Sequence, residues 1–145
     1  MFKHLLIPVD GSALSRKAVK AGVTFAKEAG ARITIYHALE IIPPYVGGEF
    51  VPPDILEQVD EGAQKQAHKI VASACRLVEG ASVPCESLIT KPSAPYLGIV
   101  EAARKRKCDA VVIASHGRTA LGTMFLGSTT MKVLRHSKVP VVVIR

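Results

Sequence analysis

The feature that most constrains this chain is the regular alternation of short apolar runs with longer amphipathic segments. Nearly continuous apolar runs of strand length, rich in β-branched residues, are typical of strands buried on both faces. Between these runs the apolar residues recur every three or four positions, which indicates helices with one buried face. The expected strands span residues 2–9, 31–39, 83–90, 110–114 and 139–144, and the expected helices span 12–29, 54–79, 93–107 and 127–136.

This alternation predicts a parallel sheet with helices on both faces, because parallel strands are joined by crossover helices. The sequence therefore indicates an α/β fold built on a doubly wound, Rossmann-like, five-stranded parallel sheet. Residues 1–145 are expected to form a single domain. Ser12 is the expected N-cap of the first helix and Gly30 its end. Segment 43–53 contains four prolines and two glycines, and we expect a mobile surface loop there with no regular element.

Composition narrows the class of protein. The longest apolar run is far shorter than the roughly 18 to 20 residues of a membrane span, and the first residues lack the apolar region of a signal peptide. The cysteines (Cys75, Cys85 and Cys108) have the spacing of neither a disulfide framework nor a zinc site, so we expect small core residues in a reducing cytoplasm. The net charge of +7 lies mainly at helix ends, and only 5% of the residues are aromatic, so a nucleic-acid partner is not indicated.

The most informative segment for function is 114–129, where glycines and hydroxyl residues lead directly into a helix. Gly117 and Gly127 can adopt positive φ and can let a ligand approach the backbone closely. Ser128 and Thr129 stand at the helix start, where unpaired N–H groups and the helix dipole favour an anion. Because the segment follows a central strand, it predicts a phosphate site, although a capped surface loop is the alternative reading.

Familiar catalytic and nucleotide motifs fit this chain badly. Gly122 and Gly127 have the spacing of a P-loop, but Ser128 stands where the phosphate-binding lysine belongs. No GxGxxG follows a strand, Pro8 replaces the nucleophile of aspartyl phosphatases, and the five histidines show no metal-ligand spacing. Asp10, at the end of the first strand, remains a candidate for binding ribose, base or a metal, or for forming a turn.

Both ends of the chain and the glycine segment together resemble the universal stress protein family. The beginning reads Ile-Pro-Val-Asp-Gly-Ser over 7–12, and the end reads Ser-Lys-Val-Pro-Val-Val-Val-Ile over 137–144. In between, Gly117, nine residues, Gly127 and Ser128 match the family's nucleotide motif. The first glycine of that motif is Ala114 here, a methyl group on backbone expected to lie close to the ligand.

The resemblance implies the strand order 3-2-1-4-5 and an ATP, ADP or AMP ligand, with Mg²⁺ as a possible companion of the triphosphate. It also implies a homodimer formed through the last strand, Val141–Ile144. The implied nucleotide site comprises Pro8, Val9, Asp10, Ser12, Ala38, Ile113, Ala114, Ser115, His116, Gly117, Arg118, Gly127, Ser128 and Thr129. By this resemblance adenine and ribose are expected near Pro8, Val9, Asp10, Ala38 and Ile113. The phosphates are expected over Gly117, Gly127, Ser128 and Thr129.

The function expected from this resemblance is that of an adenine-nucleotide-binding regulatory protein of the stress response. Two alternatives stay open, namely a slow ATPase and a dimeric interaction module without nucleotide. Paired carboxylates, a water-positioning glutamine and an arginine finger cannot be assigned, so efficient hydrolysis has no evident machinery.

Overall fold

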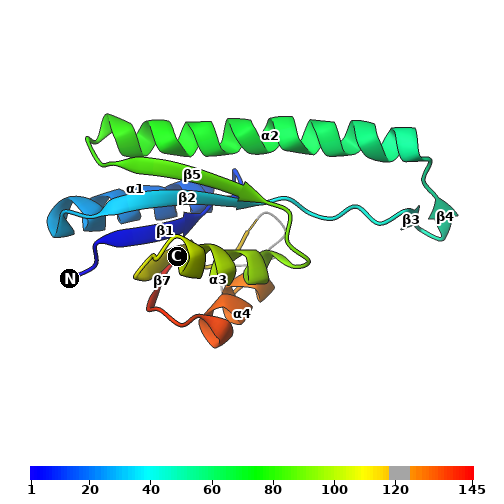
Figure 1. Ribbon diagram of the computed structural model, residues 1–145. Helices are drawn as coiled ribbons and strands as arrows, with labels where there is room; N and C mark the ends of the chain where they lie inside the picture. Colours follow the sequence, from blue (N-terminus) through cyan, green and yellow to red (C-terminus); the bar gives the residue numbers. More distant parts are fainter. Residues whose placement is uncertain (118–124) are drawn as a thin grey trace.

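The computed structural model describes residues 1–117 and 125–145, and Figure 1 shows their arrangement. Seven strands and four helices are present in these ranges. In chain order the elements are β1 (His4–Pro8), α1 (Ala13–Ala29), β2 (Arg32–Ala38), β3 (Tyr45–Val46), β4 (Glu49–Phe50), α2 (Pro53–Gly80), β5 (Cys85–Thr90), α3 (Pro95–Lys105), β6 (Ala110–Ala114), α4 (Ser128–His136) and β7 (Val141–Ile144).

Five of the strands form one parallel sheet in the order β5-β2-β1-β6-β7. Counted along the main sheet alone, this is the order 3-2-1-4-5, so the predicted fold class is confirmed. All five residues of the central strand β6 are buried, whereas those of the edge strand β7 are half-buried. The apolar runs of the sequence therefore mark burial between two helical layers, as expected for parallel strands.

The two faces of the sheet have separate cores. Helices α1 and α2 cover one face, and α3 and α4 cover the other (Figure 1). The largest fully buried side chains of the first core include Leu5, Ile7, Val19, Ile33, Ile35, Val78 and Val112, and those of the second include Leu6, Tyr36, Val111 and Val133. Alternate residues of each strand supply alternate cores, because successive side chains of a strand point to opposite faces.

The ends of α1 are those the sequence predicts. The Ser12 side chain accepts a hydrogen bond from the Ser15 N–H, and Gly30 closes the helix with a φ of 61°.

The predicted start of the third long helix was wrong by two residues. That helix, α3, begins at Pro95 rather than Ser93, because proline's fixed φ and missing N–H suit the first helical position.

The prediction of an irregular loop over 43–53 was also wrong. Strands β3 and β4 pair antiparallel in a small hairpin, joined by Gly47 and Gly48 with φ of 61° and 85°. Positive φ at both central residues is what a two-residue hairpin turn of matching twist requires. The Gly-Gly pair was therefore a hairpin signal, which the surrounding prolines obscured.

The long helix α2 is only partly packed on the sheet. Its C-terminal part buries Ile70 and Val78 against β2 and β5, but its N-terminal part extends past the end of the sheet toward the hairpin (Figure 1). Ile55 and Val59 lie on the apolar face predicted from the sequence, yet they are 41% and 49% exposed. None of the helices in the described part of the chain could cross a membrane.

The three cysteines are free thiols in this structure, and only Cys108 is fully buried. Cys108 is buried beneath α3, and Cys75 of α2 lies with its Sγ 3.1 Å from the Sγ of Cys85 at the start of β5. Burial raises the pKa of Cys108 to about 11 and also raises the pKa of Cys75. These thiols therefore remain protonated and unreactive near neutral pH.

Candidate functional site

The candidate site lies at the carboxyl ends of the neighbouring strands β1 and β6. Successive elements cross to opposite faces of the sheet at this point, which is where parallel α/β sheets bind ligands. The loop after β1, with Asp10, and the segment after β6, with Gly117, therefore meet there although they are far apart in the sequence. Arg118, which the sequence also predicted as a site residue, lies outside the described residues.

Asp10 is positioned by a tight turn. Its Oδ1 accepts a hydrogen bond of 2.9 Å from the Ser12 N–H, and Gly11 has a φ of 82°. The other carboxylate oxygen faces the glycine segment, since a Cβ built on Gly117 would lie 2.7 Å from Asp10 Oδ2. Asp10 thus forms the turn with one carboxylate oxygen and faces the glycine segment with the other.

Ser12 was predicted both as a cap and as a site residue, and its hydrogen bonds are those of a cap. Its Oγ accepts from the Ser15 N–H at 3.1 Å, and the Ser15 hydroxyl donates to the Ser12 carbonyl. Ser12 also lines a hollow of about 210 Å³ between α1 and α2. Its side chain therefore faces the α1–α2 layer.

The glycines of the segment are needed for close approach and not for positive φ. Neither Gly117 nor Gly127 has a φ in the left-handed region, and Gly127 has a φ of −62°. A Cβ on Gly127 would lie 3.1 Å from His116 Cα, and the Gly127 N–H donates to the Ser115 carbonyl at 2.8 Å. Gly127 thus fits a narrow space in which two backbone segments touch.

The start of α4 is anchored to the end of β6. The Thr130 hydroxyl donates a buried hydrogen bond of 2.8 Å to the Ala114 carbonyl, a contact that sequence reasoning missed. Gly127 is the N-cap and supplies no side-chain hydrogen bond, while Ser128 is exposed and Thr129 half-buried. The first-turn N–H groups have no acceptor within the helix, so this end of α4 can receive an anion.

Three of the residues expected near the adenosine share one face of the sheet. Ala38 and Ile113 belong to or pack against the core beneath α3 and α4, and strand alternation places Pro8 on the same side. Val9 points to the opposite core and is 7% exposed. Its side chain is therefore held in the α1–α2 layer, and only its backbone can face a ligand on the Pro8 side.

His37 is a site neighbour that the sequence did not single out. Its Nδ1 donates a hydrogen bond of 2.7 Å to the Val9 carbonyl, while the Val9 N–H donates to the Tyr36 carbonyl. These bonds fix the ends of β1 and β2 relative to each other. The signal available in the sequence was only its position, directly before Ala38 at the end of the second expected strand.

The structure shows where the methyl group of Ala114, the residue in place of the first motif glycine, points. Ala114 is 7% exposed and belongs to the core beneath α1 and α2, so its methyl group points into that core. Because side chains alternate along β6, the face toward the Pro8 side is occupied by Ile113. The alanine that replaces the motif glycine therefore adds packing to the core beneath α1 and α2. Its methyl group does not narrow the space on the Pro8 face of the sheet.

In the part of the chain that the structure describes, no three His, Cys, Asp or Glu side chains are placed so that they could hold a metal ion together. His116, the histidine of the glycine segment, lies with its Nδ1 3.1 Å from the Ser115 hydroxyl. This contact agrees with a role in holding the segment's shape.

Comparison with known proteins gives a consistent result. Residues 1–145 match the model of the universal stress protein family. A universal stress protein of Thermus aquaticus is 32% identical over the full length of both chains. The solved structure of the Methanocaldococcus jannaschii protein MJ0577 superposes with a TM-score of 0.87 at 23% identity, covering 99% of this chain and 96% of that one.

Two further solved structures of similar fold contain adenine nucleotides. One is a universal stress protein in complex with cAMP, with a TM-score of 0.73 and 22% identity over 99% of this chain and 97% of that one. The other is an Arabidopsis thaliana family protein with AMP bound, with a TM-score of 0.71 and 14% identity over 98% of this chain and 90% of that one. At these identities the likeness shows a common fold.

Proposed function

We infer that this chain, which belongs to the universal stress protein family, binds an adenine nucleotide at the carboxyl ends of β1 and β6 and acts as a regulatory module. The nucleotides held by its structural relatives support the class of ligand. The geometry of the segments that follow β1 and β6 supports the position of the nucleotide site.

The observation that carries this proposal is the approach of Asp10 to the glycine segment beside the start of α4. The carboxylate faces Gly117, where a side chain would collide with it. An adenosine lying against Pro8, Ala38 and Ile113 would place its ribose hydroxyls near Asp10, which accepts hydrogen bonds. Its phosphates would then meet the first-turn N–H groups of α4 and the hydroxyls of Ser128 and Thr129.

Mg²⁺ is proposed only as a companion of a triphosphate. Asp10 is the one predicted site residue with a carboxylate, and a single carboxylate together with phosphate oxygens is a common way for proteins to hold Mg²⁺. The ion would therefore arrive with ATP and not occupy the protein alone.

The ligand can be identified by mass spectrometry of material released from a fresh, undialysed preparation. Retained AMP or ATP supports the proposal. ADP that accumulates with time favours a slow ATPase, and the absence of any nucleotide favours an interaction module.

The position of the site can be tested by calorimetric titration with AMP and ATP. Gly127→Val should abolish binding, because the side chain would press on His116 and fill the space that phosphate needs. Gly62→Val, the same change on an exposed face of α2, is the matched control and should bind as the wild type does. Unchanged binding by a folded Gly127→Val variant would place the pocket elsewhere.

We also propose a homodimer formed through the edge strand β7. Among the described residues β7 is the last strand on its side of the sheet, and pairing two such edges would satisfy the outer backbone groups of both. An apolar hollow of about 230 Å³, lined in part by Phe2, Phe25 and Val142, extends the apolar surface beside this edge. Sedimentation at tens of micromolar should show a dimer, and Phe25→Ser should weaken it by about tenfold or more. A wild-type monomer at that concentration would exclude this interface.

A further inference from the structure

The part of the chain that projects past the sheet has an apolar surface that the other described residues leave exposed. We call residues 40–62 the arm; it consists of the β3–β4 hairpin and the first turns of α2 (Figure 1). The rings of Tyr45 and Phe50 contact each other edge to face at 5.6 Å but remain 61% and 58% exposed. The other exposed apolar side chains of the arm are Ile41, Val46, Ile55 and Val59.

The arm is also set apart by its charge. Residues 33–64 contain six of the chain's 12 carboxylates and no lysine or arginine, whereas all 19 Lys and Arg lie outside this segment. The side chains of Glu40, Glu49, Asp54 and Glu57 are exposed. A surface that is both apolar and uniformly acidic fits a partner that is apolar and basic, and it repels nucleic acid.

The same chain carries a surface with the opposite charge, which we call the α4 face. It combines exposed apolar side chains with cations, and its members are Met131, Lys132, Leu134, Arg135 and Lys138. Tyr96 of α3 supports this face, with its ring 5.1 Å from the His136 ring and 5.4 Å from Lys132 Nζ.

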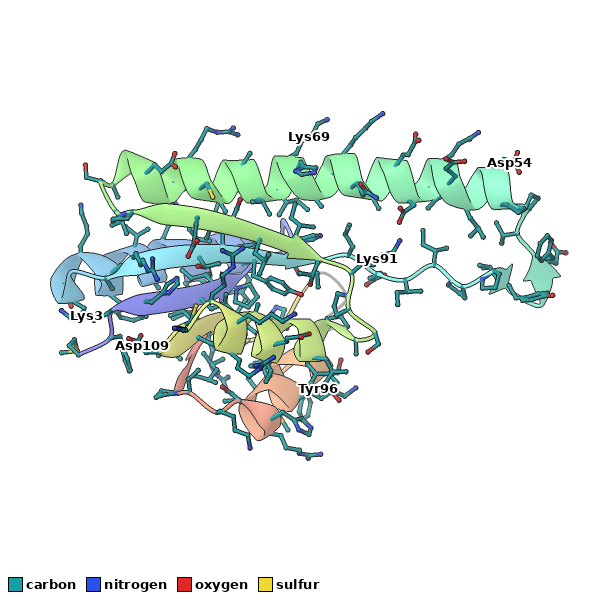
Figure 2. The ribbon with its side chains drawn as sticks, viewed as in Figure 1. Lys3, Asp54, Lys69, Lys91, Tyr96 and Asp109 are labelled. Atoms are coloured by element: carbon teal, nitrogen blue, oxygen red, sulfur yellow. The ribbon has the colours of Figure 1, made fainter. Side chains whose placement is uncertain are left out.

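The arm and the α4 face of one molecule lie on different sides of that molecule. Figure 2 shows Asp54 at the projecting end of α2 and Tyr96 beside α4 on the other side of the molecule. An ion pair between Asp60 and Lys91 joins α2 to the segment after β5, near the base of the arm. Because the arm continues directly into a packed helix, it cannot fold back onto its own α4 face without breaking α2.

We propose that the arm of one copy docks on the α4 face of a second copy of this chain. Apolar contacts from Tyr45 and Phe50 to Met131 and Leu134 would supply the buried centre, and the opposite charges would steer the two surfaces together. The contact uses neither the β7 edge nor the nucleotide site, so it adds to the proposed dimer and does not depend on it.

The test is zero-length cross-linking with a carbodiimide, which joins a carboxylate to a lysine amine. The protein is used at about 50 µM, above micromolar dissociation constants, as a mixture of unlabelled and nitrogen-15-labelled chains. Because the arm contains no lysine, every cross-link from it leads to another region. We expect mixed-isotope links from Glu49, Asp54 or Glu57 to Lys132 or Lys138, and fewer of them in 0.5 M salt.

The Asp60–Lys91 pair provides an internal control, since it should cross-link within one chain whatever the state of assembly. If that link forms and mixed-isotope links from the arm to α4 do not, the proposal is overturned. Links spread evenly over lysines on all faces would overturn it as well.

Paired variants give a second, independent test by sedimentation. An arm variant, Tyr45→Ser with Phe50→Ser, and an α4 variant, Lys132→Glu with Arg135→Glu, should each weaken this association by about tenfold or more. All four positions are exposed, so both variants should fold. Charge reversal at Lys20 and Lys27, which are exposed on α1, is the matched control and should change nothing.

Mixing the two variants distinguishes this contact from a symmetric one. The arm variant retains its α4 face and the α4 variant retains its arm, so one intact contact can form between them. Recovery of association in the mixture is the expected result. Association that stays lost in the mixture, or that neither variant weakens, would exclude docking of the arm on α4.

Discussion

The two halves of α2 have the same sequence pattern but different surroundings. In the C-terminal half, Ala67, Ile70, Ala74 and Val78 are buried against the sheet. In the N-terminal half, Ile55 and Val59 continue the same apolar face past the end of the sheet, where no strand of the sheet covers it. A helical period therefore identifies which face of a helix is apolar, but the length of the sheet decides how much of that face the chain itself can bury.

The largest difference between the halves should appear when one isoleucine from each is shortened. Ile70→Ala, at 9% exposure, should lower the free energy of unfolding by about 2 to 5 kcal/mol, because it leaves a cavity between α2 and the sheet. Ile55→Ala, at 41% exposure, should change it by no more than about 0.5 kcal/mol. Urea denaturation at a concentration where the protein is monomeric measures both, and equal losses would show that the N-terminal half is packed as well.

The fold could be predicted from the sequence because its signals are local and repeated. Apolar runs, the Ser12 cap and the Gly30 end indicate strands and helix limits without reference to distant residues. The hairpin was missed because Gly47 and Gly48 lie among prolines, and the start of α3 was misplaced because Ser93 is a good cap preceding a better first residue, Pro95.

The candidate site could be predicted only in part. The sequence identifies Asp10 and Gly117 by their places after strands, but their contact depends on strand order, for which the family resemblance was needed. The direction of the Ala114 methyl group depends on the alternation of β6 between two cores, and so does the burial of Val9. Thr130 and His37 act through single hydrogen bonds to distant carbonyls, which no local pattern indicates.

Replacing either of two helical glycines by alanine should have a smaller effect on stability, and the two effects should have opposite signs. A Cβ on Gly98 of α3 would overlap the Tyr36 hydroxyl and lie 2.7 Å from Pro92 Cγ, so Gly98→Ala should destabilise the fold by about 1 to 3 kcal/mol. The Tyr36–Thr90 hydrogen bond of 2.7 Å would be disturbed as well. Gly62, on the overhanging half of α2, has open space around it among the described residues.

Gly62→Ala should therefore stabilise the fold by about 0.5 to 1 kcal/mol, since alanine favours the helix over the unfolded chain. Thermal unfolding of both variants measures the contrast. A destabilised Gly62→Ala variant would mean that something in the molecule or its assembly covers that side of α2, and the expected independence of the overhanging half would be lost.

The smallest effect is that of pH on stability, and it contrasts His4, a buried residue of β1, with an exposed histidine of α2. Burial, together with the nearby Arg32, lowers the pKa of His4 below its ordinary value of 6.5, although Glu86 and Asp109 oppose the shift. Its Nε2 lies 2.7 Å from the Thr34 hydroxyl, which itself donates to Glu86. In the neutral ring Nε2 therefore carries the hydrogen, and this N–H donates a hydrogen bond to the Thr34 hydroxyl.

The sign of the pH effect follows from the direction of that shift. As the pH falls below 6.5, the unfolded chain takes up a proton on His4 more readily than the folded protein does. The contribution of His4 to stability is thus complete above pH 6.5 and is lost as the pH falls through the lowered folded-state pKa.

Melting curves between pH 7.5 and 5.5 should show a smaller loss of stability for His4→Gln than for the wild type. His68→Gln, an exposed change on α2, should keep the wild-type slope. If His4→Gln and His68→Gln lose stability in parallel with the wild type, then His4 takes up its proton equally easily in the folded and unfolded states, and its burial in β1 does not exclude its charge.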